Sequence, residues 1–218
     1  KFDNITLSGR NNVAVVSGMD GRDNANSIFE NISVKNSNVT ATGVYASNFV
    51  GRKFGGKIKN VYVQGTLTVS TTENGGIVGA IHQAIQIENV VSNVDIKRTT
   101  STDARNANGG FIGNIYNTPS IKNSISIGNM TGLTSDGTVN SHKFTAATEA
   151  IITSSLANCY ELSSATGISS VTQNTQNSLK EATDENVRDR NFYINTLNFD
   201  ENIWNLDNVA TNGYPELK

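Results

Sequence analysis

The residue types that most often perform chemistry are few in this chain and lie far apart. There are two histidines, His82 and His142, and one cysteine, Cys159. Neither histidine belongs to an H-E-x-x-H pair, whereas a catalytic zinc takes three protein ligands. A reactive thiol needs an activating neighbour, and the sequence names none for Cys159, which we expect to be a small buried residue. The sequence therefore predicts no metal, no cofactor and no catalytic residue in this chain.

A short charged stretch offers an alternative to a non-catalytic chain, namely an enzyme that acts on polysaccharides. It contains Asp95, Lys97, Arg98, Asp103 and Arg105. Enzymes that cleave acidic polysaccharides on a parallel β-helix gather carboxylates and basic side chains on one sheet face, so a polysaccharide-cleaving enzyme is one reading of the stretch. Mixed charges on a solvent-exposed face are also ordinary. We keep Asp103 and Arg105 as candidate binding residues.

These residues lie within a repeat, which is the strongest feature of the sequence. An apolar residue, a spacer and an Asn occur in this order five times, and the Asn residues are Asn31, Asn60, Asn89, Asn123 and Asn158. Successive Asn residues are 29 (60−31), 29 (89−60), 34 (123−89) and 35 (158−123) positions apart. A repeat of this length predicts stacked structural units. A repeated unit usually builds shape, while catalysis needs residues that occur once.

Each unit has a second marker upstream, two apolar residues followed by a small one. Examples are Phe49-Val50-Gly51, Ile77-Val78-Gly79 and Phe111-Ile112-Gly113. Alternation of β-branched residues, as in Val61-Tyr62-Val63, predicts short half-buried strands. We therefore predict an all-β fold, a right-handed parallel β-helix of about five rungs over residues 1–177.

The recurring Asn suits the corners of such rungs. Asn tolerates the left-handed backbone that a sharp bend requires. Stacked Asn amides can also hydrogen-bond from one rung to the next. We expect the five repeat Asn residues to form a structural ladder rather than a ligand site.

Composition and charge limit the partners. The 218 residues are 36% hydrophobic and 7% aromatic, with 19 Gly and 2 Pro, which fits a thin aliphatic core. The net charge is −2. The sequence has no basic patch with interleaved aromatic residues, so it does not predict nucleic-acid binding. No apolar run reaches the length of a membrane span, so we expect no membrane insertion in this segment. The chain opens in mid-pattern, which we interpret as a fragment of a larger protein.

The C-terminal part, residues 178–218, departs from the repeat. Ser178 and Glu181 have the spacing of a capping box, which predicts a helix over about 178–191. Aromatic residues concentrate after it. We expect the helix and these aromatic residues to cap the open end of the stacked units. The alternative is that Trp204 and Tyr214 line a carbohydrate site, since aromatic faces stack on sugars.

Two Gly-rich strings carry a family resemblance. GGIVG at 75–79 and GGFIG at 109–113 resemble the GLUG-type repeat of bacterial surface proteins. Together with Asn158-Cys159-Tyr160, the helix and the ending F-D, I-W, G-Y-P, they resemble a region of streptococcal zinc metalloproteases of the immunoglobulin A protease type. This region lies upstream of the catalytic domain in that family. The resemblance covers about residues 28–217.

The resemblance implies a secreted or cell-surface bacterial parent, a virulence factor. In that family the metal and catalytic residues lie in a separate domain with H-E-x-x-H, so no catalytic residue can be carried over. The β-helix would hold the protease domain of the same polypeptide in place, or engage a host glycoprotein such as immunoglobulin A. The alternative is a surface adhesin repeat that binds a host protein or glycan. The long loops near 99–108 and 131–148 are further places for binding.

Overall fold

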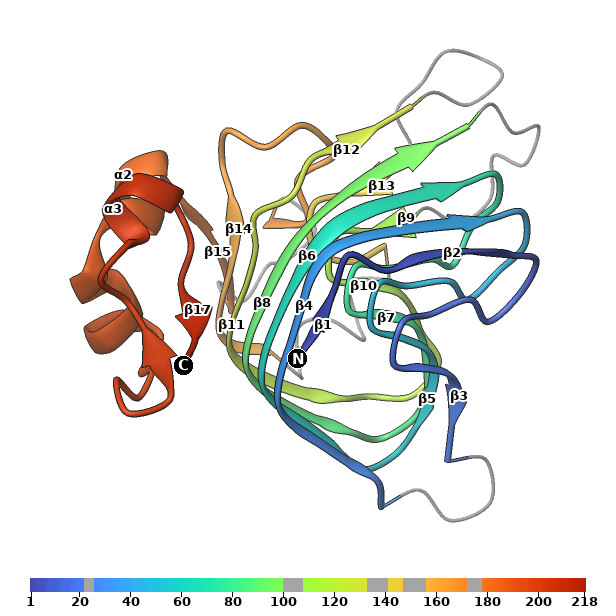
Figure 1. The fold of residues 1–218 in the computed structure, drawn as a ribbon, viewed down its shortest axis with the longest axis horizontal. Helices are drawn as coiled ribbons and strands as arrows, with labels where there is room; N and C mark the ends of the chain where they lie inside the picture. Colours follow the sequence, from blue (N-terminus) through green and yellow to red (C-terminus); the bar gives the residue numbers. More distant parts are fainter. Residues whose placement is uncertain (22–25, 100–107, 133–140, 147–155, 172–177) are drawn as a thin grey trace.

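The chain is predominantly β, and its long strands run parallel. A computed structural model describes residues 1–21, 26–99, 108–132, 141–146, 156–171 and 178–218. Strands make up 53% of the residues and helices 9%, in agreement with the predicted all-β parallel fold. In Figure 1 the long strands follow one another from blue to orange across the molecule, in the order of the sequence.

The larger sheet takes a strand from each repeat unit. Its order is β1-β4-β6-β8-β11-β14-β15, with β2 also paired to β4 and β12 to β8. The strands are β1 (Phe2–Asp3), β2 (Thr6–Gly9), β4 (Ile28–Ala41), β6 (Lys57–Val69), β8 (Gln86–Arg98), β11 (Ser120–Ser126), β12 (Met130–Thr131), β14 (Leu156–Leu162) and β15 (Leu179–Ala182). The register follows the repeat, so Phe29 pairs with Ile58 and Ile58 pairs with Ile87.

The upstream markers of the first four units contribute to a smaller parallel sheet. Its order is β10-β7-β5-β3, and the strands are β3 (Ser17–Asp20), β5 (Val50–Phe54), β7 (Val78–Gln83) and β10 (Ile112–Ile115). A short parallel pair joins β9 (Asn108–Gly109) to β13 (Ser141–His142). Apolar side chains of both sheets, such as Val50 and Ile58, meet in one buried cluster. The core therefore lies between the two sheets.

Each repeat Asn occupies a sharp bend within or at the middle of a strand of the larger sheet. All five have a left-handed backbone, with φ between 50° and 58°. Their amides form a continuous chain of hydrogen bonds from Nδ2 to Oδ1: Asn60 to Asn31 (2.9 Å), Asn89 to Asn60 (3.1 Å), Asn123 to Asn89 (3.3 Å) and Asn158 to Asn123 (3.0 Å). The corner geometry and the ladder that the sequence predicts are both observed. We call this chain the Asn ladder.

Glycine in the upstream marker is required by close approach of neighbouring units. A Cβ on Gly79 would lie 2.5 Å from the carbonyl oxygen of Gly51, and a Cβ on Gly113 would lie 2.5 Å from that of Gly79. Real Cβ atoms do not come this close to backbone oxygen. The glycines that end the second, third and fourth markers thus allow these units to stack closely.

The predicted helix over 178–191 is wrong at its start. Leu179–Ala182 is strand β15, which pairs with β14 and extends the larger sheet past residue 177. The helix α2 (Asp184–Arg188) begins one residue after Thr183, which forms the capping box with Asn186. Thr183 Oγ1 accepts a hydrogen bond from the Asn186 backbone N–H at 3.2 Å. The sheet ladder therefore takes precedence over the local capping signal at Ser178.

The C-terminal unit, defined as residues 183–218, packs on the side of the larger sheet. It contains α2, the π-helical turn η2 (Phe192–Thr196), α3 (Val209–Asn212) and the antiparallel pair β16 (Trp204–Asn205) and β17 (Glu216–Leu217). Its aromatic residues bury a row on the sheet's outer face: Tyr62, Val91, Ile125 and Tyr160. Figure 1 shows the unit beside β11, β14 and β15. We expected this unit to cover the open end of the apolar stack. It packs instead on the outer face of the larger sheet, because that face carries this apolar row.

Candidate functional site

The described residues of the charged stretch are divided between the two faces of β8. Asp103 and Arg105 lie outside the described residues. Side chains alternate along β8, so Asp95 and Lys97 are exposed while Arg98 is buried on the other face. A polysaccharide-cleaving site would need acidic and basic groups together. Asp95 and Lys97 share the exposed face, but Arg98 is buried on the other face and cannot join them.

Trp204 does not offer a sugar-binding face. Its side chain is 1% exposed, and its ring stacks on Phe199 with the centroids 4.4 Å apart. Tyr214 is half-buried and stacks on Tyr62 at 5.4 Å. The Trp204 ring packs inside the C-terminal unit, and the Tyr214 ring packs between this unit and the larger sheet. The alternative of a carbohydrate site is therefore wrong for Trp204.

Cys159 and His142 are buried structural residues. Cys159 follows a ladder Asn and is fully buried, as predicted. Burial raises the pKa of its thiol to about 12, which keeps it protonated and unreactive at neutral pH. His142 lies in β13, where burial lowers the pKa of its imidazole. Neither side chain is placed for chemistry with a ligand.

Three stacked rings form a cluster that reaches the surface of the described part of the chain. We define the aromatic column as Phe54, His82 and Tyr116. The ring centroids of Phe54 and His82 are 4.8 Å apart and those of His82 and Tyr116 are 4.5 Å apart, with interplanar angles of 17° and 22°. Phe54 and His82 lie at the ends of β5 and β7, and Tyr116 directly follows β10. The parallel pairing of these strands brings the three rings together, with a register shift at Phe54, which pairs with Gln83 next to His82. Tyr116 is 49% exposed, so the column reaches solvent.

Arg52 binds one side of the column. Its Nε donates a hydrogen bond to His82 Nε2 at 3.2 Å, and its guanidinium lies 4.6 Å from the Tyr45 ring centroid and 5.2 Å from that of Phe54. Burial and the positive charge of Arg52 lower the pKa of His82, against an opposing effect of Glu73. His82 is therefore neutral at physiological pH, with Nε2 as the acceptor.

Glu73 holds the other end of the column. Both its carboxylate oxygens accept from the Tyr116 hydroxyl at 2.9 Å, and Oε1 also accepts from Asn114 Nδ2 at 3.1 Å. Burial and the neighbouring Tyr45 and Glu73 raise the pKa of Tyr116. The Tyr116 hydroxyl thus stays protonated and its ring is fixed in one orientation.

The backbone next to the column is strained. Tyr45 and Glu73 have φ of 65° and 62°, a left-handed conformation that costs about 1–2 kcal/mol for such residues. The Tyr45 N–H donates to the Glu73 carbonyl oxygen at 3.1 Å, so the two strained residues are neighbours in adjacent units. Such strain concentrates at functional sites, where the surrounding structure enforces it.

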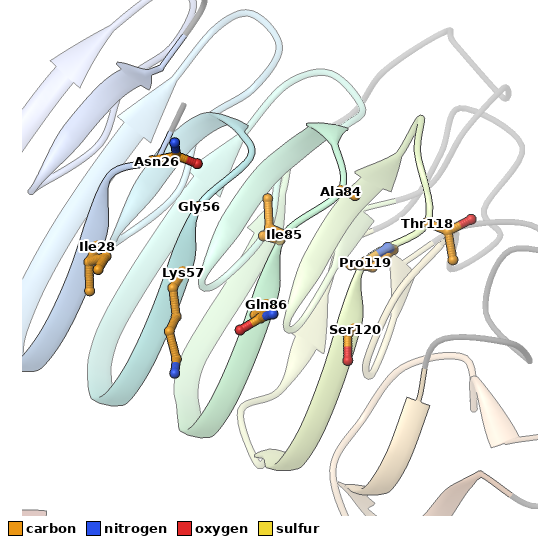
Figure 2. A pocket seen from close by; sticks show the side chains of 10 residues that line it. All are labelled: Asn26, Ile28, Gly56, Lys57, Ala84, Ile85, Gln86, Thr118, Pro119 and Ser120. Carbon is orange, nitrogen blue, oxygen red and sulfur yellow. The ribbon is translucent and has the colours of Figure 1, made fainter. Parts of the chain in front are cut away.

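A groove lies at the bend that follows the column in the chain. We define the corner groove by its lining residues: Asn26, Ile28, Gly56, Lys57, Ala84, Ile85, Gln86, Thr118, Pro119 and Ser120. It encloses about 590 Å³. Figure 2 shows that these residues come from successive units, with small side chains at the bend and Ile28, Lys57, Gln86 and Ser120 on the first positions of neighbouring strands. Among these, Ile28 is 63% exposed.

The column and the groove are successive parts of the same bends. Phe54 is followed by Gly56, His82 by Ala84 and Tyr116 by Thr118, in each case two positions later. On the side of the aromatic column, the bend thus presents ring edges, a carboxylate and a guanidinium. On the side of the corner groove, it presents an apolar floor with an ammonium and amide groups. This arrangement is suited to binding a ligand with both apolar and polar faces.

The sequence contains a signal for the column, which is an aromatic ring at the same position of three units. In the second, third and fourth units the residue three positions after the marker Gly is Phe54, His82 and Tyr116. An aromatic ring at one position of three stacked units must form a column when the units are in register. No local motif marks the column, because its residues lie about 30 positions apart in the sequence.

The comparisons with known proteins give no relative: no family model, curated protein or solved structure matches the chain. Within the described residues, no three His, Cys, Asp or Glu side chains gather where they could hold a metal ion. The described helices include none long and apolar enough to cross a membrane.

Proposed function

We propose that this chain is a non-catalytic module of a secreted or cell-surface zinc metalloprotease, which positions the protease domain and engages a host immunoglobulin. In this proposal the two parallel sheets are faces of a right-handed β-helix of about five rungs. The shared register of both sheets and the Asn ladder through five units support it. Each unit of such a solenoid contacts only its neighbours, which gives an elongated, rigid platform.

The observation that carries the recognition role is the aromatic column beside the corner groove. The rings of His82 and Tyr116 are fixed by hydrogen bonds to Arg52 and Glu73, so they are already ordered before a ligand binds. A preorganised surface loses little conformational entropy on binding. Tyr and Arg are also the residues that most often dominate the energy of protein interfaces. The choice of immunoglobulin A as ligand rests on the resemblance of the Gly-rich repeat strings.

The proposal is tested by binding of the purified chain to immobilised immunoglobulin A. Tyr116→Ala removes the exposed ring, and Gln86→Arg places a bulky charge in the groove. We expect each change to weaken binding roughly tenfold, equivalent to about 1.4 kcal/mol. Glu181→Gln, on the exposed face of β15, is the matched control and should bind like the unmodified chain. Cleavage of immunoglobulin A by the chain alone would contradict a non-catalytic role.

The second candidate function is that of a surface adhesin that binds glycans. The exposed ring edges of the aromatic column favour this function. Sugars present an apolar face and a rim of hydroxyl groups, which matches rings flanked by Glu73, Asn114 and Arg52. Binding to enzymatically deglycosylated immunoglobulin A separates the two. Retention of affinity supports protein recognition, while loss of binding together with capture of free glycans supports the adhesin.

A further inference from the structure

One column of register partners in the smaller sheet changes character from unit to unit. Ile115 pairs with Ile81, Ile81 pairs with Lys53, and Lys53 pairs with Asp20. Ile81 and Ile115 belong to the main core cluster. The Lys53 side chain is 0% exposed and that of Asp20 is 16% exposed. A core position that is aliphatic in the third and fourth units therefore holds a pair of opposite charges in the first two.

Three polar groups meet at this pair. Lys53 Nζ is in ion-pair contact with Asp20 Oδ2 and donates a hydrogen bond to Ser27 Oγ at 2.6 Å. The Ser27 hydroxyl in turn donates to the same Oδ2 atom. The three side chains thus form a closed triangle. The carboxyl carbon of Asp20 lies one bond beyond the oxygen that the Lys53 nitrogen contacts.

The surroundings of Lys53 disfavour its charge. Its Nζ lies 5.1 Å from the centroid of the Phe29 ring, and a Cβ on Gly56 would lie 3.1 Å from it. Burial lowers the pKa of Lys53, against the opposing hydrogen bond and charge of Asp20. Ions that leave water lose hydration, and their mutual attraction often fails to offset this loss. Transfer of one proton from Nζ to the carboxylate gives a neutral amine and a carboxylic acid, which are the forms that react with each other.

We propose that Lys53 and Asp20 form an isopeptide cross-link between the first two units, with Ser27 as the proton relay. One proton first passes from the ammonium to the carboxylate. Nζ then attacks the carboxyl carbon, so the Nζ–Cγ bond forms and the Cγ–Oδ2 bond breaks. Ser27 takes a proton from Nζ and gives its own to Oδ2, which leaves as water. The ion pair contains every atom of the amide and of the water.

The fixed geometry favours this condensation. Well-oriented neighbouring groups react as if each were present at about 10⁵ M or more. The amide removes two charges from a position where the neighbouring units have Ile81 and Ile115. The partial exposure of Asp20 gives the released water a path to solvent. The cross-link joins two units of the stack and does not rest on the proposed function.

A second ion pair in the chain serves as an internal control. Lys35 Nζ lies 2.5 Å from Glu216 Oε1, and it also joins segments that are far apart in the sequence. Its lysine keeps access to water, with 16% of the side chain exposed, and the Glu216 side chain is 30% exposed. We expect this pair to remain ionic. The purified chain should therefore contain one cross-link.

Mass spectrometry of the whole denatured chain tests the proposal. We expect a mass lower than that of the sequence by one water molecule. Trypsin does not cleave after an acylated lysine, so the digest should contain a branched peptide, residues 11–22 joined to residues 53–57. Fragmentation of this peptide locates the bond at Asp20 and Lys53.

Two variants separate the cross-link from other losses of water. Asp20 precedes Gly21, and ring closure to a succinimide at this step would remove the same mass. Lys53→Met keeps a long side chain without an amine, so it should have the full sequence mass, whereas a succinimide would persist in it. Ser27→Ala keeps both reacting groups and loses the relay. We expect cross-linking in freshly synthesised Ser27→Ala to be slower by roughly tenfold or more.

Three results would overturn the proposal. The first is the full sequence mass for the unmodified chain after prolonged incubation at neutral pH. The second is loss of water that persists in Lys53→Met or that maps to a peptide without a branch. The third is a branched peptide at Lys35 and Glu216 in place of the expected one. Equal rates of cross-linking in Ser27→Ala and the unmodified chain would overturn the role of Ser27.

Discussion

At the scale of single residues, Asn does two separate jobs at each corner. It adopts the left-handed backbone more easily than other residues with a Cβ, and its amide links neighbouring units. Asn60 does both, since it donates to Asn31 and accepts from Asn89. Its φ is 51°. A substitution at this residue can therefore separate backbone conformation from side-chain hydrogen bonding.

We predict that Asn60→Ala lowers the free energy of unfolding by about 2–4 kcal/mol. Left-handed Ala costs about 1–2 kcal/mol, and each buried amide that loses its partner adds about 1–3 kcal/mol. Asn60→Gly keeps the conformation and loses only the ladder, so its effect should be smaller. Urea unfolding of the two variants measures the difference. Stability equal to that of the unmodified chain in both would show that the ladder contributes nothing.

His82 makes the aromatic column sensitive to pH. Its pKa is lowered in the folded state, first by burial and then by Arg52, and the other groups around it are Glu73, Tyr45 and the two column rings. Below the ordinary His pKa of about 6.5 the unfolded chain binds a proton that the folded chain resists. Stability is therefore complete above about pH 6.5 and falls as the pH decreases through that value.

We predict that the thermal midpoint of the unmodified chain falls between pH 7.5 and pH 5 more steeply than that of His82→Gln. Gln cannot be protonated in this range, and the contribution of His142, whose pKa is also lowered, is common to both proteins. Thermal unfolding followed by circular dichroism gives both slopes. Parallel slopes would exclude His82 as the source.

At the scale of elements, the strands and corners were predictable but the C-terminal unit was not. The period located both markers, because one position in every unit must make the same bend. The alternation in Val61-Tyr62-Val63 already implied that Tyr62 points away from the core. What the period could not show was that Val91, Ile125 and Tyr160 fall in the same outer row, which requires the register. Without this row, the aromatic C-terminal residues had no predicted surface except the end of the stack.

The same limit explains the missed capping site. Ser178 and Glu181 satisfy a local rule, whereas β15 forms because Leu179–Ala182 continues a sheet whose other strands are distant in sequence. Local capping contributes about 1 kcal/mol. Four paired residues and the burial of Leu179 and Ala182 exceed it.

We predict that Ile125→Asp releases the C-terminal unit and leaves the sheets folded. Ile125 belongs to β11 and is fully buried beneath that unit. A carboxylate at this position would lose its hydration without gaining a partner. Limited proteolysis should then cut within residues 183–218, while hydrogen exchange in β6 and β8 stays slow. Ile125→Val keeps the apolar contact and serves as the control. Loss of protection in all strands at once would show that the unit and the sheets fold as one.

At the scale of the whole molecule, stability is distributed along the units. Each strand of the larger sheet pairs with the equivalent strand of the next unit, and Lys57 is the register partner of Gln86. These two residues are 29 positions apart (86−57). A change in length by a whole unit preserves the register, whereas a change that differs from a whole unit by one residue reverses the inward and outward faces of a strand.

We therefore predict that removal of residues 57–85 gives a folded chain one unit shorter, and that removal of residues 57–86 does not. The first deletion joins Gly56 to Gln86, so that β4 pairs with β8, β5 pairs with β10 and Asn31 meets Asn89. Glu30 would then face Glu88, a like-charge pair, so both deletions include Glu30→Lys. The second deletion shifts β8 by one residue and turns Ile87 and Val90 out of the core.

Cooperative thermal unfolding for the first deletion and its absence for the second would support units stacked in fixed register. X-ray scattering should show the first to be shorter by about 4.8 Å, one strand spacing. Similar behaviour of the two deletions would mean that register does not govern this fold.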